Sequence, residues 1–574
     1  MKGYLKQAIC LFFSLFFLAL LLGSACAAVY EVGPGLTYES IGQVPWNSLG
    51  PGDKVLIHYK ASPYHEKWVI ARAGTAENPI IIRGVPGPSG QLPIIDGNNA
   101  VTSQSLNFWS EERGIINIGG SNVGSQFPRN IVIENLDIRN ARPPYTFKDD
   151  HGSTKSYSKN AAAIYIIEGE GITVRNCRIH NCGNGLFACH ASGSIVIEYC
   201  HIFDNGIEGS YYQHNTYTEA KGIVYQFNHF GPLRDGCGGN NLKDRSAGTV
   251  IRYNWIEGGN RQLDLVDSDY QELTGHPSYR KTFVYGNVLF ERGNEGNSQI
   301  VHYGGDSGEL SRYRKGTLYF YNNTVVSKRT SNTTIFRLSS QDETCIATNN
   351  IFFVTAPGGH LAISNRDGTV RLKNNWLKAG WVKSHEGSGF SGEIVNLGGN
   401  ISGNAPGFVG LSSMDLGLTL GSSCVNAGTA NIPGASPDHP VNFQYRKHQA
   451  AEPRPKAGAM DIGAFERAQV QSNRNPVIYA FTAVPVTVSN PGIFIQFSAQ
   501  ASDPDGDNLL YKIEFGDGTV DFKKSPGHRY WKKGQYHVVL TVSDGKGGEA
   551  KRALDVTVND KPPSAPKKLS GKKQ

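Results

Sequence analysis

The 574-residue sequence has few of the residues and motifs that mark common intracellular enzymes. It contains only three methionines against 68 glycines, which is unusual for a helical protein. No P-loop, Gly-x-Ser-x-Gly or His-Glu-x-x-His motif occurs, which excludes the nucleotide-binding, α/β-hydrolase and metalloprotease classes that use them. Beyond the N-terminus, no apolar run is long enough to cross a bilayer. The abundant Gly, Asn and β-branched residues indicate many short strands joined by tight turns.

The N-terminus carries an export signal. Lys2 and Lys6 precede an apolar run at 9–22, and small residues follow at 23–28. This pattern is typical of a signal peptide, here residues 1–27. Cys26 also resembles the lipidated cysteine of a bacterial lipobox, so a lipid anchor is the alternative. We expect a secreted protein, extracellular or periplasmic, with attachment to the cell surface left open.

Cysteine and charge add two limits. Of nine cysteines, seven remain after residue 27, so at least one thiol is free or pairs between chains. The formal charge is +7, and part of the excess lies in the Pro- and Lys-rich tail at 560–574, which we expect to be disordered. A mildly basic secreted protein suits an acidic glycan, and we expect no nucleic-acid partner.

A weak motif recurs between about residues 130 and 380: an apolar residue, two variable residues, a small polar residue, one variable residue and another apolar residue. It occurs at 133–138, 174–179 and 251–256, among other places. Counted from Cys177, successive small residues are 23, 28, 26, 33, 36, 27 and 25 residues apart. A fixed motif at variable spacing predicts a solenoid whose loops absorb the differences in length.

The small position of the motif is an asparagine in its later copies: Asn228, Asn254, Asn287, Asn323, Asn350 and Asn375. At a buried turn, stacked carboxamides both donate and accept along the solenoid axis. Cys177 and Cys200 take the same position in earlier copies. We expect them to stack as thiols, with a disulfide between neighbouring coils as the alternative.

Residues 28–467 resemble the right-handed parallel β-helix superfamily of polysaccharide lyases and hydrolases. Besides the ladder, the resemblance lies in the entry segments 49–57 and 78–84 and the exit segments 404–408 and 460–466. It implies an all-β, right-handed solenoid with terminal caps, and an extracellular polysaccharide as partner. It does not imply the reaction, because fold does not determine function.

A second domain follows a polar linker at 468–475. Alternating strands at 493–497, 511–515, 536–542 and 553–558 predict an immunoglobulin-like β-sandwich over 476–559. The segments 515–518, 528–530 and 540–544 closely resemble a PKD domain. Asp503, Asp505 and Asp507 offer clustered carboxylates for Ca²⁺, and a solvated acidic turn is the alternative.

Strands that precede the ladder would stack at about 4.8 Å into a sheet whose outer face suits an extended polymer. On this row we expect His190, His302 and Tyr303 to bind substrate. The sequence leaves open which side chains of 300–303 point outward. An inward side chain would have a structural role.

The segments 240–246 and 261–265 distantly resemble the alginate-lyase and chondroitinase-B branch of the superfamily. The resemblance implies Lys243 as base and Arg245 as acid or as the cation that neutralises a uronate carboxylate. His214, with Tyr217 behind it, is the alternative base. Asp264 and Asp267 would be Ca²⁺ ligands or partners of the two cations. The chain lacks the paired acidic ligands that this branch has just before its lysine.

Three functions follow as hypotheses. The first is a lyase that cleaves a uronate-containing polysaccharide by β-elimination. The second is a non-catalytic glycan-binding or adhesion protein, in which Lys243 and Arg245 only pair with Asp244 and Asp264, and His214 caps a turn. The third is a glycoside hydrolase, although the core lacks polygalacturonase signatures, as it lacks the Arg-x-Pro-x-x-Arg pattern of pectate lyases.

Overall fold

The computed structural model describes residues 27–293, 295–434, 438–468 and 473–560. Cys26 and all but the last residue of the expected signal peptide fall within 1–26, and nearly all of the expected tail falls within 561–574, outside the described residues. The described chain is nearly all β, with short helical turns only: η1 (Ile41–Gln43), η2 (Trp46–Ser48), η3 (Glu111–Arg113), α2 (Gln271–Thr274) and η4 (Gly387–Gly389). None of the described helices has the length and apolar character needed to span a membrane.

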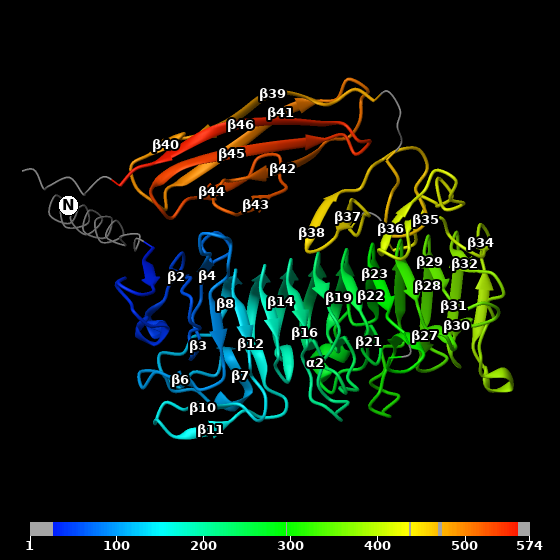
Figure 1. The fold of residues 1–574 in the computed structure, drawn as a ribbon, viewed down its shortest axis with the longest axis horizontal. Coiled ribbons are helices and arrows are strands. Elements are labelled where there is room, and N and C mark those ends of the chain that lie inside the picture. Colours follow the sequence, from blue (N-terminus) through cyan, green and yellow to red (C-terminus); the bar gives the residue numbers. More distant parts are fainter. Residues whose placement is uncertain (1–26, 294, 435–437, 469–472, 561–574) are drawn as a thin grey trace, which may run out of the picture.

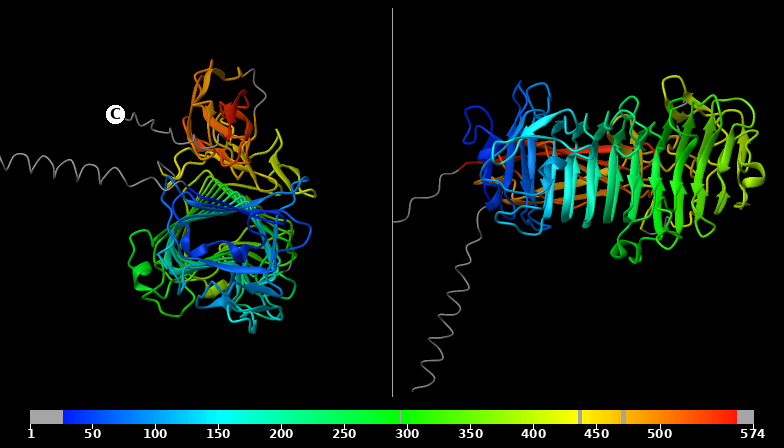
Figure 2. Two further views of the ribbon diagram at one scale, coloured as in Figure 1. Left: turned by 90° about the vertical axis from the view of Figure 1, so that its left-hand side faces the viewer. Right: turned by 90° about the horizontal axis from the view of Figure 1, so that it is seen from below.

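Residues 29–403 form a parallel β-helix with three rows of strands (Figures 1 and 2). The first row consists of β3 (Glu66–Ile70), β7 (Gly114–Ile118), the N-terminal parts of β12 (Ala162–Arg175), β14 (Asn184–Glu198) and β16 (Thr216–Gln226), then β18 (Leu242–Asp244), β21 (Leu263–Leu265), β24 (Gln299–Tyr303), β27 (Thr333–Leu338) and β30 (Leu361–Ser364).

The second row continues from the same coils. It contains β1 (Val29–Val32), β2 (Lys54–His58), β4 (Ile80–Val85), β8 (Arg129–Glu134), the C-terminal parts of β12, β14 and β16, then β19 (Ala247–Arg252), β22 (Lys281–Tyr285), β25 (Thr317–Tyr321), β28 (Thr344–Thr348), β31 (Thr369–Lys373) and β33 (Glu393–Asn396).

The third row closes each coil. It contains β5 (Ile94–Asp96), β9 (Asp137–Arg139), β13 (Arg178–His180), β15 (His201–Phe203), β17 (His229–Phe230), β20 (Trp255–Glu257), β23 (Val288–Glu291), β26 (Thr324–Ser327), β29 (Ile351–Val354), β32 (Trp376–Lys378) and β34 (Ile401–Gly403). Side chains that point into the coils from all three rows form one apolar core.

The asparagine ladder lies at the turn between the second and third rows. Asn254 Nδ2 donates to Asn287 Oδ1 at 3.0 Å, and Asn287 Nδ2 donates to Asn323 Oδ1 at 3.0 Å. The same bond repeats down to Asn375 and on to Asn400. Each carboxamide also accepts from the backbone N–H of the preceding ladder residue, so the ladder satisfies polar groups that the turn would otherwise leave unpaired. The predicted ladder is present.

Cys177 and Cys200 extend the ladder as thiols. The backbone N–H of Cys177 donates to Cys200 Sγ, and Cys200 N donates to Asn228 Oδ1 at 2.9 Å. All seven cysteines in the described residues are unpaired, so the disulfide alternative does not hold. A small thiol fits the fully buried position that a carboxamide fills in later coils.

Short β-pairs decorate the solenoid. One edge of the N-terminal coils carries β6 (Ala100–Thr102), β10 (Thr146–Lys148) and β11 (Thr154–Ser156). After the last coil come two hairpins, β35 (Phe408–Gly410) with β36 (Asp415–Leu418) and β37 (Phe443–Arg446) with β38 (Ala450–Pro453). Side chains from these hairpins form a second apolar cluster with Trp255 and Trp376 on the outside of the third row.

The C-terminal domain is a sandwich of two sheets whose strands pair antiparallel except for β40 (Thr487–Val488), which pairs in parallel with β46 (Glu549–Val558). One sheet contains β39 (Val477–Val484), β41 (Phe494–Ser502) and β44 (Gly527–Arg529), and the other contains β40 (Thr487–Val488), β46 (Glu549–Val558), β45 (Gly534–Ser543), β42 (Leu510–Glu514) and β43 (Val520–Asp521). The sandwich lies along the second row (Figure 1). Lys54 Nζ in β2 stands 3.4 Å from the centroid of the Trp531 ring, and Phe443 in β37 meets Phe522 edge to face, so both the coils and a hairpin that follows them contact the sandwich.

Candidate functional site

The register of the first row places five different polar side chains side by side. Strand pairing aligns Tyr217 with Lys243, Lys243 with Asp264, Asp264 with His302 and His302 with Arg337. The residues on either side of each alternate inward and are buried, as the period of two of a β-strand requires. These five residues therefore form one outward column across consecutive coils, which we call the polar column.

Lys243 lies between two carboxylates. Its Nζ is 2.7 Å from Asp264 Oδ2 and 2.5 Å from Asp306 Oδ2, and only 8% of its side chain is exposed. Burial alone would lower the pKa of Lys243, but Asp264 and Asp306 outweigh it and raise that pKa above its ordinary value. Lys243 is therefore an ammonium group at neutral pH, which opposes its expected role as a base.

Arg245 occupies the next outward position after Lys243 in the same coil, and its guanidinium also reaches Asp306. Its Nε donates to the Tyr217 hydroxyl at 2.9 Å, its Nη1 to the backbone oxygen of Asp267, and its Nη2 to Asp306 Oδ1 at 2.7 Å. Asp306 thus spans both cations, one carboxylate oxygen on each. About 32% of its side chain is exposed, against 8% for Lys243 and 12% for Arg245.

His302 is a neutral imidazole held in one orientation. Its Nδ1 donates to Asp264 Oδ1 at 2.7 Å, and its Nε2 lies 2.9 Å from the Ser339 hydroxyl. Burial lowers the pKa of His302 despite the bond to Asp264. Burial would raise the pKa of Asp264, but Lys243 and His302 hold it well below its ordinary value. Asp264 is therefore ionised, and His302 can accept a proton at Nε2.

His214 borders the polar column as a buried group. The backbone N–H of Asn240 donates to His214 Nδ1 at 2.9 Å, and the ring lies 5.7 Å from that of Tyr217. Burial, with Lys243 next to it, lowers the pKa of His214 to about 3. Because Nδ1 is engaged as an acceptor, Nε2 carries the proton. This arrangement matches the turn-capping alternative and leaves His214 without a free lone pair.

Two expected side chains point into the coil. Tyr303 is fully buried beside Leu265 and Leu338, so the prediction that it binds substrate is wrong. Asp244 is also fully buried, where it accepts from Thr218 and Thr249 and lies 3.5 Å from Arg314 Nη2. In both cases the residue before it occupies the outward position, and a shift of one residue turns a side chain to the other face.

An aromatic groove of about 500 Å³ adjoins the polar column and shares Tyr217 with it. Its walls include Trp109, Tyr165, Phe187 and Tyr270. His190 lies here, not in the polar column: its ring stacks on Tyr270 at 3.4 Å and its Nδ1 is 2.7 Å from Glu272 Oε1. Flat aromatic faces with a few polar groups are typical of ligand clefts.

Glu219 is the buried acid of this groove. Ser268 Oγ donates to its Oε1 at 2.6 Å, and burial raises the pKa of the carboxyl above its ordinary value. Only 8% of the residue is exposed. A carboxyl group with a raised pKa in a cleft is a candidate proton donor.

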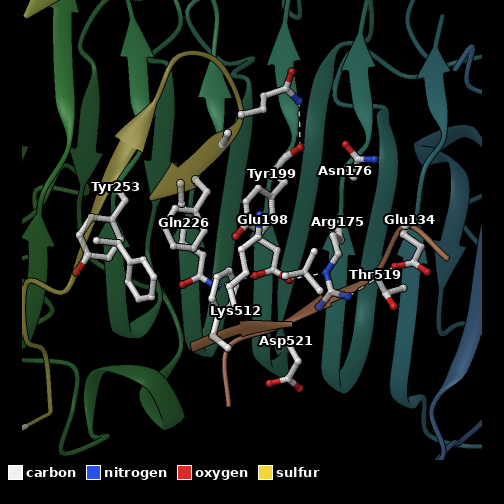
Figure 3. A pocket seen from close by; sticks show the side chains of 18 of the residues that line it. Glu134, Arg175, Asn176, Glu198, Tyr199, Gln226, Tyr253, Lys512, Thr519 and Asp521 are labelled. Atoms are coloured by element: carbon white, nitrogen blue, oxygen red, sulfur yellow. Dashed lines mark hydrogen bonds and ion pairs between the residues drawn. The ribbon is translucent and has the colours of Figure 1, made fainter. Parts of the chain in front are cut away.

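A larger pocket of about 600 Å³ lies between the second row and the sandwich (Figure 3). Arg175, Glu198 and Gln226 of the solenoid face Lys512 and Asp521 across it. Arg175 Nε donates to Glu198 Oε1 at 2.5 Å, and Gln226 Nε2 donates to Glu198 Oε2 at 2.6 Å. These polar groups satisfy one another across neighbouring coils, which suits a contact between domains.

The two expected Ca²⁺ sites differ in their fit. The carboxylate of Asp264 accepts hydrogen bonds from Lys243, His302 and Asn240. The carboxylate of Asp267 accepts from the Ser307 hydroxyl and from the backbone N–H of Asp306. Their oxygens are engaged by donors, so this pair does not fit a cation. Asp503, Asp505 and Asp507 each offer an oxygen, and these oxygens lie within 4.8 Å of one another. Among the described residues, Asp503 Oδ2 and Asp507 Oδ2 are buried without a hydrogen-bond partner, so this acidic loop fits a divalent cation.

Sequence reasoning missed Asp306 and Ser339. Asp306 follows β24 after Gly304 and Gly305, and Ser339 follows β27 directly. Their positions in the repeat could have indicated both residues. Each comes shortly after a strand of the first row, as Arg245 comes directly after β18. Asp306 belongs to the loop of 13 residues between β24 and β25, and the repeat does not predict that this loop brings it to Lys243 and Arg245.

Comparisons with known proteins identify the smaller domain. Residues 473–558 match the family model of the PKD domain. Collagenase ColQ1 of Bacillus cereus is 43% identical over 67 residues, which is 12% of this chain and 7% of the collagenase. Collagenase ColA of Bacillus cereus is 39% identical over 69 residues, with the same coverage. The match thus spans 7% of the length of these relatives, and the C-terminal sandwich is a PKD domain.

Solved structures give two kinds of match. The PKD1 domain of Vibrio anguillarum Epp is 27% identical and covers 16% of this chain and 100% of its own, with a TM-score of 0.14. A GH136 lacto-N-biosidase from Eubacterium ramulus is 13% identical and covers 65% of this chain and 68% of its own, with a TM-score of 0.41.

Proposed function

We propose that this protein acts outside the cell on a uronate-containing polysaccharide and cleaves it by β-elimination at the polar column. The observation that carries the proposal is the position of Asp306. Its carboxylate spans Lys243 and Arg245 and is the most exposed member of the cluster. A uronate carboxylate has the same charge and the same pair of oxygens, so it can replace Asp306 on both cations.

The chemistry follows from that placement. β-Elimination removes the proton next to the uronate carboxylate, and two fixed cations stabilise the charge that develops on it. His302 has an accepting Nε2 oriented by Asp264, so we assign it the proton, in place of Lys243. The electron pair forms a carbon–carbon double bond as the glycosidic bond breaks. The Tyr217 hydroxyl keeps its proton at neutral pH, because burial raises its pKa despite Arg245 and Lys243, and it can protonate the departing oxygen.

The neighbouring groove supports a polymeric substrate. Tyr217 belongs both to the polar column and to the groove wall, so a chain bound against Tyr165, Phe187 and Tyr270 leads directly to Arg245. Aromatic faces pack against sugar rings while the cations hold the charged group. The length of the solenoid face suits an extended ligand.

A panel of uronate polymers tests the proposal. Purified protein is incubated with each polymer, with and without a chelator, and ultraviolet absorbance reports unsaturated chain ends. We expect unsaturated chain ends to form with at least one polymer, at the same rate with and without chelator. In Lys243→Met we expect this rate to fall at least about 100-fold. Lys221→Met, on an exposed position of β16, is the matched control. Binding without new chain ends would instead support the glycan-binding hypothesis.

Glycoside hydrolysis is a second candidate because of Glu219. Its raised pKa and its place in the aromatic groove suit a general acid. Hydrolysis would create reducing ends that do not absorb in the ultraviolet. Glu219→Gln would abolish the formation of these reducing ends. Unsaturated ends that survive in Glu219→Gln would exclude this candidate.

We further propose that Asp503, Asp505 and Asp507 bind Ca²⁺ in the PKD domain. Lys546 and Arg474 already neutralise part of the acidic loop, so we expect weak binding and a modest rise in melting temperature of a few degrees. Thermal unfolding with Ca²⁺ and with chelator measures the effect. The triple Asp→Asn variant should lose the difference, and an unchanged wild-type melting temperature would contradict the site.

A further inference from the structure

Two members of the polar column, His302 and Asp264, also line up with Ser339, whose hydroxyl β-elimination does not use. Ser339 Oγ lies 2.9 Å from His302 Nε2, and His302 Nδ1 donates to Asp264 Oδ1 at 2.7 Å. The three residues come from consecutive coils, after β27, in β24 and in β21. We propose that Ser339, His302 and Asp264 form a nucleophile, base and acid relay that hydrolyses O-acyl esters carried by the polysaccharide.

The charge states suit this relay. Asp264 is ionised and holds the Nδ1–H of His302, so Nε2 is the nitrogen that accepts. The Ser339 hydroxyl faces Nε2 and also lies 2.9 Å from the carbonyl oxygen of Gly305. A serine activated by an oriented imidazole is recognised by geometry and by role, and it occurs on unrelated folds.

Each step balances with water as the only co-reactant. Ser339 Oγ bonds to the ester carbonyl carbon while its proton moves to His302 Nε2. The bond between that carbon and the sugar oxygen breaks, and the sugar oxygen takes the proton from His302. Water then gives one proton to His302 and attacks the acyl-serine, which releases the carboxylic acid and restores the Ser339 hydroxyl with that proton.

Two groups near Ser339 can stabilise the oxyanion. The backbone N–H of Gly305 donates to Ser339 Oγ at 2.8 Å, so a backbone donor lies next to the atom to which the acyl carbon would bond. Arg337 stands beside His302 in the polar column and precedes Ser339 by two residues. Its positive charge favours the developing oxyanion.

The substrate class rests on the proposed function. Lys243 and Arg245 require a free uronate carboxylate, because a methyl-esterified uronate has no charge to replace that of Asp306. The ester that reaches Ser339 is therefore an O-acyl group on an acidic polysaccharide, not a uronate methyl ester. Both reactions would share the carboxylate anchor, and only ester hydrolysis needs Ser339.

The first experiment uses a fluorophosphonate probe on the full chain. We expect covalent labelling of wild type, with mass spectrometry placing the adduct on Ser339. Ser339→Ala should lose it, and Ser340→Ala, whose hydroxyl bonds to Glu343, should keep it. Absence of labelling in wild type, or an adduct on another residue, would overturn the relay, and neither result depends on a variant that must fold.

The second experiment measures acetate release from an acetylated uronate polymer. We expect release by wild type and a loss of at least about 100-fold in Ser339→Ala and His302→Gln. Labelling at Ser339 without acetate release would overturn the O-acyl assignment. Ultraviolet absorbance on the deacetylated polymer is followed in parallel. Absence of that ultraviolet signal from wild type would contradict β-elimination, while the labelling result still decides the relay.

Discussion

The asparagine ladder and the polar column are built from the same coils and obey opposite rules. In the ladder, one side chain repeats, and each copy bonds to the next at 2.9–3.1 Å. In the polar column, consecutive coils supply Tyr217, Lys243, Asp264, His302 and Arg337. Repetition gives a stack in which every polar group finds an identical partner. Where the coils carry different residues, acidic, basic and aromatic side chains come within hydrogen-bonding distance of one another, as a catalytic site requires.

The largest expected effect comes from breaking the ladder. Asn287→Leu removes the donor to the carbonyl oxygens of Ile251 and Tyr285 and the acceptor for Asn254 N. Buried groups left unpaired cost about 1–3 kcal/mol each, so we expect a loss of about 4 kcal/mol in the free energy of unfolding. Denaturant unfolding measures it, with the exposed Asn122→Leu as control. A loss below 1 kcal/mol would contradict the importance of the ladder.

Next, a variant in the polar column should impair activity more than stability. Arg245→Leu removes the cation that spans Asp306 and Tyr217, and we expect at least about a 100-fold loss of kcat/KM, or about 2.7 kcal/mol of transition-state stabilisation. The half-exposed Arg292→Leu serves as control. Full activity in Arg245→Leu would remove this residue from the site.

A third effect concerns acid. The pKa of His214 is lowered to about 3 in the folded protein, against about 6.5 when unfolded, so the unfolded state binds the proton first as pH falls. Stability is therefore complete above pH 6.5 and decreases from there towards pH 3. At pH 5 we expect a loss of about 2 kcal/mol from this residue. The comparison of wild type with His214→Asn at pH 7 and pH 5 isolates it, and equal pH dependence would refute the assignment.

The smallest effect should be a gain. Asp306→Asn removes the carboxylate that competes with the substrate, so we expect uronate oligosaccharides to bind about 10-fold more tightly, or about 1.4 kcal/mol. Isothermal titration measures the affinity. Asp342→Asn, an exposed carboxylate paired with Lys315, is the control. Weaker binding in Asp306→Asn would mean that Asp306 holds the substrate and does not mimic it.

The solenoid could be predicted from the sequence because every coil must satisfy the same buried polar groups at the same turn. A motif that places a carboxamide at every turn predicts both the solenoid and the ladder, and the PKD strands follow their own alternation. The thiol stack of Cys177 and Cys200 followed from position alone, since both occupy the buried slot of the ladder.

The candidate site was only partly open to such reasoning. The stacking of Lys243 and Asp264 follows from counting coils, but Tyr303 shows that a one-residue error in alternation moves a side chain from groove to core. Asp306 belongs to a loop, and loops absorb the differences between coils. Ion pairs such as that between Lys243 and Asp306 therefore depend on backbone paths that no repeat dictates.

The most direct test is a crystal structure of the protein with a uronate oligosaccharide from a polymer that it binds. We expect one carboxylate of the ligand to lie within hydrogen-bonding distance of both Lys243 Nζ and the Arg245 guanidinium, with Asp306 displaced from both and sugar rings against Tyr217. An oligosaccharide bound in the pocket between the solenoid and the PKD domain, with Asp306 still on its two cations, would contradict the account.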